Sequence, residues 1–411
     1  MRAFCVSLLL TSALFGFDLP TLIDQAQQNE QVQAYVQRAE AAALGYETVK
    51  SSYLPRVDLG ASASYLDERG TFDVPETYKA YAEANFIILD GFKRKNLLDE
   101  KAMDSRASRF DLADFKKATS LQVIRLYFDL QSVNADIDAL EKNRQQLNEQ
   151  LERFKLFKSA GIATDEDVER LNAAVADADY KITARRYETD DLRSKLQLLS
   201  GSVLEGEQTA RSVTAPATPE AQRLDSLEAM AYRTRALGYA AQQADSVYYP
   251  SVVLNDTYTW YDYENYHPAF SGIEFADKQN RLTLQLSMNL IDFGAAREQK
   301  QAILLQQRAQ ALELRYAEKS ADADRALARK AIERAKALIE AAEKAKTASD
   351  KTFAVVKKKY EARVVDYIRY LDALSKATEA RAQYARAVSG LNIANAAYLY
   401  NLGLDPKEYV K

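Results

Sequence analysis

Residues 281–290 carry the sequence RLTLQLSMNL, in which every second side chain is apolar. Successive side chains of a strand point to opposite faces, so this alternation predicts a strand with one apolar and one polar face. Residues 57–65 (VDLGASASY) and 78–88 (YKAYAEANFII) alternate in the same way, and residues 252–261 are rich in Val, Tyr, Thr and Trp. Strands of about 9 to 11 residues cross a bilayer at a tilt. Half-buried strands of a soluble sheet have the same pattern, so this alternative remains open.

Strand number restricts how such a protein can enter a membrane. The smallest transmembrane barrels have about eight strands, and lipid does not tolerate open sheet edges, so four strands cannot span a membrane alone. Two copies of the chain would supply eight strands around a filled interior, and three copies would supply twelve strands around a lumen. A trimer is the simplest assembly that forms a conduit.

The segments between the strands predict very long helices. Glycine and proline number only 13 and 8 among 411 residues, and helix-forming residues place apolar side chains at spacings of three and four. We expect helices over residues 19–51, 93–157, 165–200 and 224–247. The second of these would measure on the order of 100 Å at 1.5 Å per residue, several bilayer thicknesses. A soluble coiled-coil rod is the alternative that the helices alone leave open.

The chain also repeats itself. A constant shift of 202 positions pairs Asp90 with Asp292 and Gly201 with Gly403, which indicates an internal duplication. We therefore expect a first repeat over 17–200 with strands at about 57–65 and 78–88 and a hairpin tip near 158–167. A second repeat over 224–403 would carry strands at about 252–261 and 281–290 and a tip near 360–369. An equatorial linker over 201–223, with Gly206, Pro216 and Pro219, and a tail over 404–411 complete the predicted organisation.

The N-terminus predicts export. Arg2 precedes an apolar stretch, and small residues surround Gly16, so residues 1–16 have the character of a secretory signal peptide. The single cysteine, Cys5, lies inside this segment, which leaves the mature chain without cysteine and hence without disulfides. No run of 18 or more apolar residues follows, so no helical membrane span is expected.

Composition excludes several classes of function. The 55 basic and 59 acidic residues nearly balance, which argues against a nucleic-acid-binding surface. One His and one Cys leave almost nothing from which to build a metal site, a cysteine nucleophile or a histidine-centred acid–base system, and His267 falls in a predicted turn. The sequence offers no catalytic triad or phosphate-binding loop, so we expect no enzyme activity, no cofactor and no metal.

Taken together, these motifs resemble the TolC-like outer-membrane efflux family. Residues 53–57 (YLPRV) and 248–252 (YYPSV) look like its helix-to-strand entrances, and residues 89–92 (LDGF) and 291–294 (IDFG) look like its strand-to-helix exits. Residues 161–164 (GIAT), followed by Asp167 and Val168, are similar to a helix-hairpin tip, which 360–362 (YEA) and 371–373 (LDA) match in the second half. The resemblance covers essentially the whole mature chain, twice over.

The resemblance implies a mainly α protein with a membrane β part in the outer membrane of a Gram-negative bacterium. Its homotrimer would form a twelve-stranded barrel in lipid, continued by a twelve-helix periplasmic tunnel. This passive duct would dock on a periplasmic adaptor and an inner-membrane pump of RND or ABC type, in tripartite efflux or type I secretion. The implied adaptor-docking residues are Gly161, Ile162, Ala163, Thr164, Asp167, Arg363, Val364 and Asp366, and the implied periplasmic aperture contains Tyr360, Arg369 and Asp372.

Two residues depart from the family pattern, and simpler interpretations of the site remain. Arg363 stands in the place of the second tip glycine, and Arg369 stands where an aperture acid can occur. Gly161 can be a plain helix C-cap, and Asp366 and Asp372 can lie on a solvated face, although threefold symmetry would turn one such carboxylate into a ring that attracts cations. A periplasmic coiled-coil adaptor or structural protein is the alternative function, although an adaptor should contain glycine-rich β modules and a single hairpin. A secreted enzyme is the third functional hypothesis.

Overall fold

The computed structural model describes residues 17–67, 73–204, 208–209, 211–216, 220–264 and 275–411. The predicted signal segment 1–16, with Cys5, lies outside the described residues, as do Gly206, Pro219 and His267. Within the described ranges, no helix combines the length and apolar content that crossing a membrane requires.

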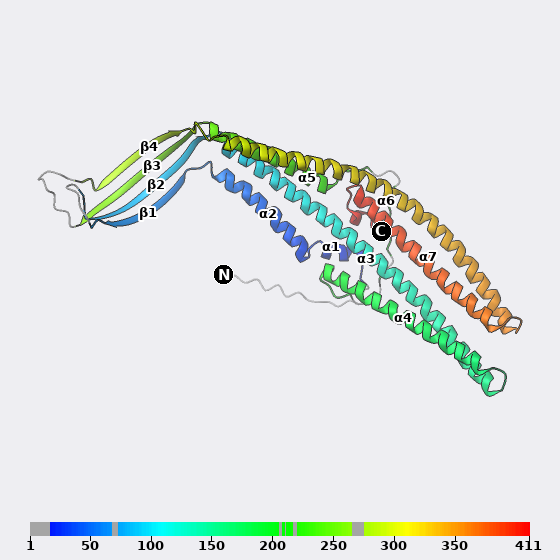
Figure 1. The fold of residues 1–411 in the computed structure, drawn as a ribbon. Helices are drawn as coiled ribbons and strands as arrows, with labels where there is room; N and C mark the ends of the chain where they lie inside the picture. Colours follow the sequence, from blue (N-terminus) through cyan, green and yellow to red (C-terminus); the bar gives the residue numbers. More distant parts are fainter. Residues whose placement is uncertain (1–16, 68–72, 205–207, 210, 217–219, 265–274) are drawn as a thin grey trace. The chain divides into compact units, whose positions relative to one another are not determined.

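Helices dominate the chain, with one antiparallel sheet (Figure 1). The elements in order are α1 (Leu19–Ala26), α2 (Glu30–Ser51), β1 (Arg56–Tyr65), β2 (Glu76–Asp90), α3 (Lys93–Ser159), α4 (Asp165–Ser200), α5 (Asp225–Ala244), η1 (Asp245–Tyr248), β3 (Ser251–Glu264), β4 (Lys278–Ser287), α6 (Ala295–Glu361), α7 (Tyr367–Asn401) and η2 (Pro406–Tyr409).

The chain divides into two compact units. The sheet unit comprises residues 36–111 and 226–317, and the hairpin unit comprises the described residues up to 35 together with 112–225 and 318–411. The long helices α3 and α6 each contribute one part to either unit.

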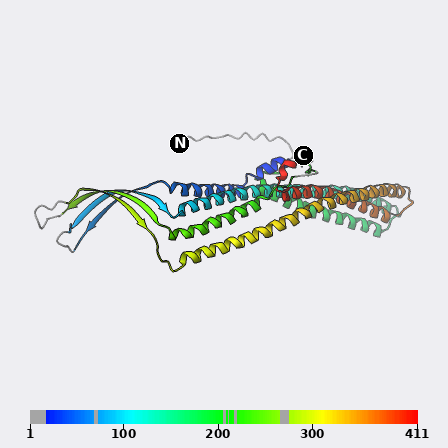
Figure 2. The same ribbon diagram turned by 90° about the horizontal axis from the view of Figure 1, so that it is seen from above.

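The sheet unit contains a curved four-stranded sheet in the order β1-β2-β3-β4 (Figures 1 and 2). Leu59 pairs with Ala82, which pairs with Tyr258, so these side chains share one face. Phe86 pairs with Leu254 and Leu254 with Leu284 on the same face. The sheet thus gathers the alternating apolar residues of all four strands on one side.

Polar side chains occupy the opposite face of the sheet. Asp58 pairs with Glu83, Glu83 with Thr257 and Thr257 with Arg281. Asn255 donates hydrogen bonds to Glu83 and, at 2.7 Å, to Asn85. The strands are therefore two-faced in the structure, with hydrogen-bonded polar side chains on one side.

Strand β4 ends at Ser287, whereas the alternation extends to Leu290. Ser287 pairs with Ser251, the first residue of β3, so the residues beyond it have no opposite strand residue to pair with. Pro250 precedes Ser251 and has no backbone N–H to donate. The apolar–polar alternation of the sequence therefore continues for three residues after the pairing of β4 with β3 has ended.

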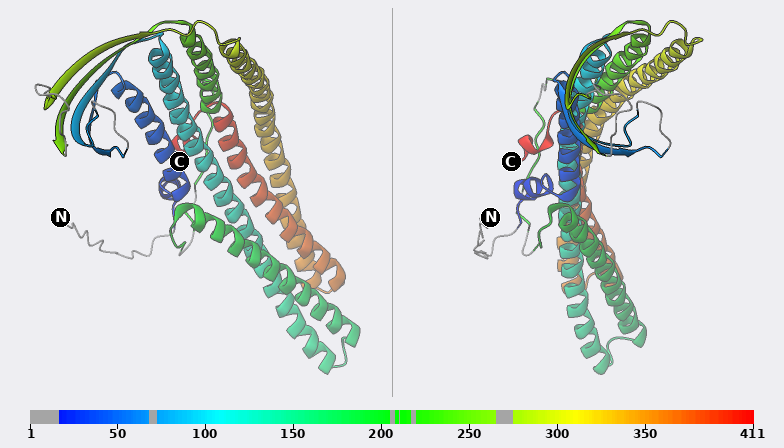
Figure 3. Two further views of the ribbon diagram at one scale, coloured as in Figure 1. Left: turned by 60° about the vertical axis from the view of Figure 1, so that its left-hand side comes forward. Right: turned by 90° about the vertical axis from the view of Figure 1, so that its left-hand side faces the viewer.

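The helical segments of the sheet unit lie side by side, in the order α2, α3, α5, α6 (Figures 2 and 3). Gln243 of α5 hydrogen-bonds to Glu100 of α3, and Gln307 of α6 donates to the Thr234 carbonyl of α5 at 3.2 Å. Polar contacts of this kind hold neighbouring helices in register.

The hairpin unit contains the hairpins α3/α4 and α6/α7, with α7 beside α3 (Figures 1 and 3). Helices α3 and α6 both have 67 residues and begin at residues 93 and 295, and α4 and α7 begin at 165 and 367. All of these starts differ by 202. Gly201 and Gly403 end the second helices in the same left-handed conformation, with φ of 69° and 79°.

One continuous helix over residues 19–51 is a wrong prediction. The structure has two helices there, α1 and α2, separated by residues 27–29. The Asn29 side chain accepts a hydrogen bond from Val32 N at 2.9 Å and donates to the Leu199 carbonyl at 3.2 Å. Asparagine satisfies helix N-termini well, so it starts α2 anew without a glycine or proline nearby.

The segment after α4 packs on α7 within the hairpin unit. Val213 is buried, its N–H donates to Asn392 Oδ1 at 2.8 Å, and its carbonyl accepts from Asn395 Nδ2 at 2.8 Å. Val213 also pairs with Val410 in an antiparallel bridge. These contacts fix the chain between the two halves of the duplication.

Candidate functional site

The turn of the first hairpin is closed by backbone hydrogen bonds around a left-handed residue. Helix α3 ends at Ser159, and Gly161 has φ of 73°. Ile162 N donates to the Phe157 carbonyl at 2.8 Å, and Gly161 N donates to the Lys158 carbonyl at 2.9 Å. This Schellman-type ending requires a positive φ, which glycine adopts without steric cost.

The second turn repeats this geometry with arginine at the left-handed position. Arg363 has φ of 58°. Val364 N donates to the Lys359 carbonyl at 2.8 Å, and Arg363 N donates to the Tyr360 carbonyl at 2.9 Å. The equivalence of Arg363 with Gly161 that the sequence predicts is thus present in the backbone, at an energetic cost of roughly 1 to 2 kcal/mol for a residue with a Cβ.

Side chains cap the helix that follows each turn. Thr164 Oγ1 accepts from Asp167 N at 3.2 Å, and Asp167 Oδ2 accepts from Thr164 N at 3.1 Å, a reciprocal capping box. The Thr164 hydroxyl also donates to Asp167 Oδ2 at 2.8 Å, and this bond, together with the one from Thr164 N, lowers the pKa of Asp167. At the second tip, Asp366 Oδ1 accepts from Arg369 N at 2.9 Å. Both tips are therefore rigid turns between capped helices.

The tips present apolar side chains to solvent. Ile162 and Val364, equivalent under the repeat, are each 68% exposed. Ala163 packs against the buried cluster behind the first tip, and a Cβ at Gly161 would meet no atom within 4 Å. Two equivalent exposed aliphatic residues on rigid turns form a surface that a partner can cover without rearranging the hairpins.

Aromatic side chains join the two tips. Phe154 of α3 lies 5.0 Å from Tyr367 of α7, and Tyr370 of α7 lies 5.0 Å from Tyr360 of α6, measured between ring centroids. Tyr360 donates from its hydroxyl to Gln150 Oε1 of α3 at 3.2 Å, and burial raises the pKa of Tyr360. The sequence analysis did not single out Gln150 or Tyr367, since helical spacing alone does not say which polar face meets another hairpin.

Two of the predicted aperture residues, Arg369 and Asp372, lie near each other on α7. Asp372 and Arg369 line a hollow of about 430 Å³ between α6 and α7. The Asp372 carboxylate binds Lys376 Nζ at 2.8 Å on the exposed surface. Tyr360 instead turns toward Gln150 of α3. The aperture that Tyr360, Arg369 and Asp372 would form between chains remains a prediction.

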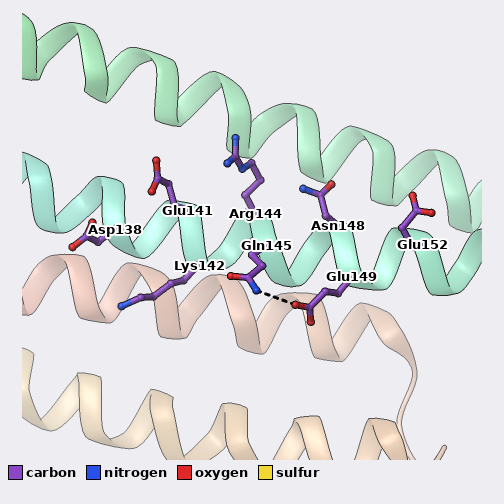
Figure 4. Close-up of a pocket in the computed structure, with 8 residues that line it drawn as sticks. All are labelled: Asp138, Glu141, Lys142, Arg144, Gln145, Asn148, Glu149 and Glu152. Atoms are coloured by element: carbon purple, nitrogen blue, oxygen red, sulfur yellow. Dashed lines mark hydrogen bonds between the residues drawn. The ribbon is translucent and has the colours of Figure 1, made fainter.

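A second hollow runs along α3 and is lined by a charged face of this helix (Figure 4). All eight of its lining side chains come from this one helix. Gln145 donates to Glu149 at 3.1 Å, and Arg144 binds Asp179 of α4 at 3.0 Å. Such a row does not converge on a substrate. Within the described ranges, no group of three or more His, Cys, Asp or Glu residues has metal-binding geometry.

Comparison with known proteins shows a likeness in sequence over part of the chain and a likeness in fold over most of it. Residues 22–202 match the model of the outer membrane efflux protein family, whereas no curated protein matches the chain in sequence. The fold is similar to that of VceC of Vibrio cholerae, with TM-score 0.80 and 16% identity over 94% of this chain and 96% of that chain. It is also similar to that of Campylobacter jejuni CmeC, with TM-score 0.83 and 14% identity over 94% of this chain and 85% of that chain. Neisseria gonorrhoeae MtrE has TM-score 0.79 and 17% identity over 94% of this chain and 89% of that chain.

The solved structures extend the likeness across both halves of the duplication, since they cover 94% of the chain. Residues 22–202 thus resemble the outer membrane efflux protein family in sequence, and the chain as a whole shares the fold of solved outer-membrane channels.

Proposed function

We propose that the protein is the outer-membrane channel of a tripartite efflux or type I secretion system, a passive trimeric duct with a periplasmic extension. The observation that carries this proposal is the two-faced sheet attached to two long helical hairpins. Leu282, Leu284 and Leu286 of β4 are 68%, 65% and 70% exposed and lie on one face. Water disfavours such a surface, whereas the hydrocarbon of a bilayer solvates it.

The edges of the sheet favour assembly of three chains. Strands β1 and β4 are the two edges of the described sheet, and open edges are unstable in lipid. Joining β4 of one copy to β1 of the next closes the ladder. Three copies of four strands make twelve, enough for a water-filled lumen lined by the polar face that includes Glu83, Asn255 and Arg281.

Exposed stripes on two helices of the hairpin unit support the same assembly. Tyr180 and Tyr187 of α4, seven residues apart, are 75% and 78% exposed. Leu327 and Leu338 of α6, eleven residues apart, are 63% and 53% exposed. Seven and eleven residues are near-integral numbers of helical turns, so the two members of each pair lie on one face of their helix, where a helix of a second copy can cover them.

The hairpin tips are the proposed contact for the periplasmic adaptor, and through it for an inner-membrane pump of RND or ABC type. Ile162 and Val364 present equivalent exposed aliphatic groups, and Gly161, Ala163 and Arg363 complete the two turns. Thr164, Asp167 and Asp366 hold the following helices by their caps. Across the threefold axis, Asp372 and Arg369 would form charged rings at the periplasmic opening, with Tyr360 holding α6 to α3.

Electrical recording tests the proposal. The purified protein is added to a planar bilayer, and stepwise increases in conductance are expected as single trimers insert. The matched control is Leu284→Arg protein, which should insert rarely because a charge on the lipid face opposes membrane entry. Absence of conductance steps from the native protein, with correctly folded material, would contradict a channel.

A further inference from the structure

A buried carboxylate links the two hairpins, far along the helices from either tip. Asp136 of α3 has a side chain only 6% exposed, and its Oδ2 lies 2.8 Å from Arg386 Nη1 of α7 and 3.7 Å from Arg185 Nε of α4. Its other oxygen, Oδ1, is buried and has no hydrogen-bond partner among the described residues. The carboxylate therefore joins three helices while half of its hydrogen-bonding capacity is unused.

Burial is the largest influence on this group. It raises the pKa of Asp136, against the attraction of Arg386 and Arg185, and Glu188 of α4 adds to the increase. The arginines are poor compensators because their own side chains are 43% and 42% exposed, and Arg185 also binds Glu188. A buried ionised oxygen without a hydrogen-bond partner is unfavourable.

A hydrated alternative lies directly beside the buried carboxylate. A groove of about 550 Å³, lined by α3, α4 and α7, includes Asp136, Arg185 and Arg386. The other charged groups in it are Asp177 and Lys181 of α4, which bind each other at 2.6 Å, and Glu379 of α7. A small separation of α7 from α3 and α4 would open the Asp136 carboxylate to water in this groove.

We propose that Asp136, Arg185 and Arg386 form a proton-sensitive clasp, in which proton binding to Asp136 tightens the packing of α7 on α3 and α4. Ionised Asp136 favours the hydrated, loosened arrangement, and neutral Asp136 favours the sealed one. The only covalent bond formed or broken is the O–H bond of the carboxyl group, whose proton comes from solvent.

The direction follows from linkage. The sealed site has a raised pKa, so it binds a proton more tightly than a solvated Asp136 does. The sealed arrangement is therefore favoured at low pH and loses this contribution as pH rises above the ordinary aspartate pKa of about 4 and through the raised value. Acidification should tighten the hairpins, and neutral pH should loosen them.

Melting of the full-length protein in detergent tests the clasp, and it does not depend on channel activity. Asp136→Asn should melt about 2 to 4 °C above the native protein at pH 7.5 and together with it at about pH 3.5, below the ordinary aspartate pKa. The matched control is Asp138→Asn, an exposed residue of the same helix, which should follow the native protein at both pH values. Equal or lower melting of Asp136→Asn at pH 7.5, or the same gain in Asp138→Asn, would overturn the proposal.

Arg386→Gln separates a proton-binding role from a purely structural one. Removing the cation that opposes the effect of burial should raise the proton affinity of Asp136, which moves the pH profile of the melting temperature to higher pH. Hydrogen exchange locates the effect: at pH 7.5, Asp136→Asn should slow amide exchange over residues 371–386 of α7 relative to the native protein. An unshifted profile in Arg386→Gln and unchanged exchange in Asp136→Asn would mean that Asp136 is a fixed ion pair.

Discussion

Gly161 and Arg363 hold the same left-handed backbone conformation at the turns of the two hairpins, with φ of 73° and 58°. Each turn is closed by a hydrogen bond from the following N–H to a carbonyl five residues back, from Ile162 to Phe157 and from Val364 to Lys359. The duplication has preserved the turn while one copy carries a residue that the conformation disfavours.

This relationship predicts opposite effects of glycine exchange at the two tips. Arg363→Gly should raise the free energy of unfolding by up to about 1 kcal/mol, because it removes the clash of a Cβ at positive φ, and Gly161→Ala should lower it by a similar amount. Lys357→Gly, an exposed interior position of α6, should cost about 1 kcal/mol and serves as the control. Thermal unfolding checks all three, and a loss in Arg363→Gly would show that the arginine side chain stabilises its turn.

The first tip also predicts a pH-dependent cap. Thr164→Ala should lower the free energy of unfolding by about 1 kcal/mol at pH 7, whereas Thr164→Ser should retain the cap. Since the hydrogen bonds from Thr164 lower the pKa of Asp167, their contribution is present above the unfolded pKa of about 4 and is lost as pH falls through the folded value. The difference in melting temperature between the native protein and Thr164→Ala should therefore be smaller at pH 3 than at pH 7. A constant difference would exclude Asp167 from the cap.

Docking at the tips is tested by charge. Ile162→Asp and Val364→Asp should abolish export and crosslinking to the adaptor without changing trimer yield, because both side chains are exposed and make no core contact. Leu156→Asp, at 70% exposure on α3 before the tip, is the matched control and should retain export. Equal loss of export in all three variants would remove the special role of the turns.

The two faces of the sheet predict that arginine substitutions at neighbouring positions of β4 have unequal effects on stability. Leu284→Arg places a charge among Leu254 and Phe86 on the apolar face and should cost about 2 to 4 kcal/mol near the middle of a bilayer. Thr283→Arg lies next to it on the face of Asn255 and should be tolerated. Urea unfolding in lipid vesicles compares the two, and equal costs would contradict the assignment of faces.

The charged residues of the aperture predict ion selectivity. A ring of Asp372 carboxylates attracts cations and a neighbouring ring of Arg369 opposes this. The preference for cations should fall in Asp372→Ala and rise in Arg369→Ala, measured as reversal potentials in a salt gradient across a planar bilayer. The control is Glu340→Ala, an exposed acid of α6 paired with Lys344. Identical selectivity in all variants would place Asp372 and Arg369 away from the pore.

Local sequence patterns carry much of this fold. The period of two in residues 57–65, 78–88 and 281–290 is sufficient to predict strands, because each side chain of a two-faced sheet meets one environment. The shift of 202 also pairs Arg363 with Gly161, and the structure gives these two residues the same left-handed conformation. These features depend on neighbours in the chain.

Other features depend on contacts between distant residues, which a single sequence does not encode locally. The break at residues 27–29 relies on Asn29 reaching Leu199. The hydrogen bond from Tyr360 to Gln150, and the burial of Asp136 between Arg185 and Arg386, require one polar face of α3 to meet another hairpin. Polar side chains are spread along α3, so its sequence alone does not show which polar face is buried against another hairpin.

The number of chains in the membrane-extracted particle tests the central claim most directly. Outer membranes of cells that express the protein are solubilised in mild detergent, and the unheated complex is weighed by native mass spectrometry. If three copies join their sheets edge to edge, the unheated complex should have the mass of three mature chains. After heating, the mass should be that of a single chain. A single chain recovered from the soluble periplasmic fraction would contradict the account.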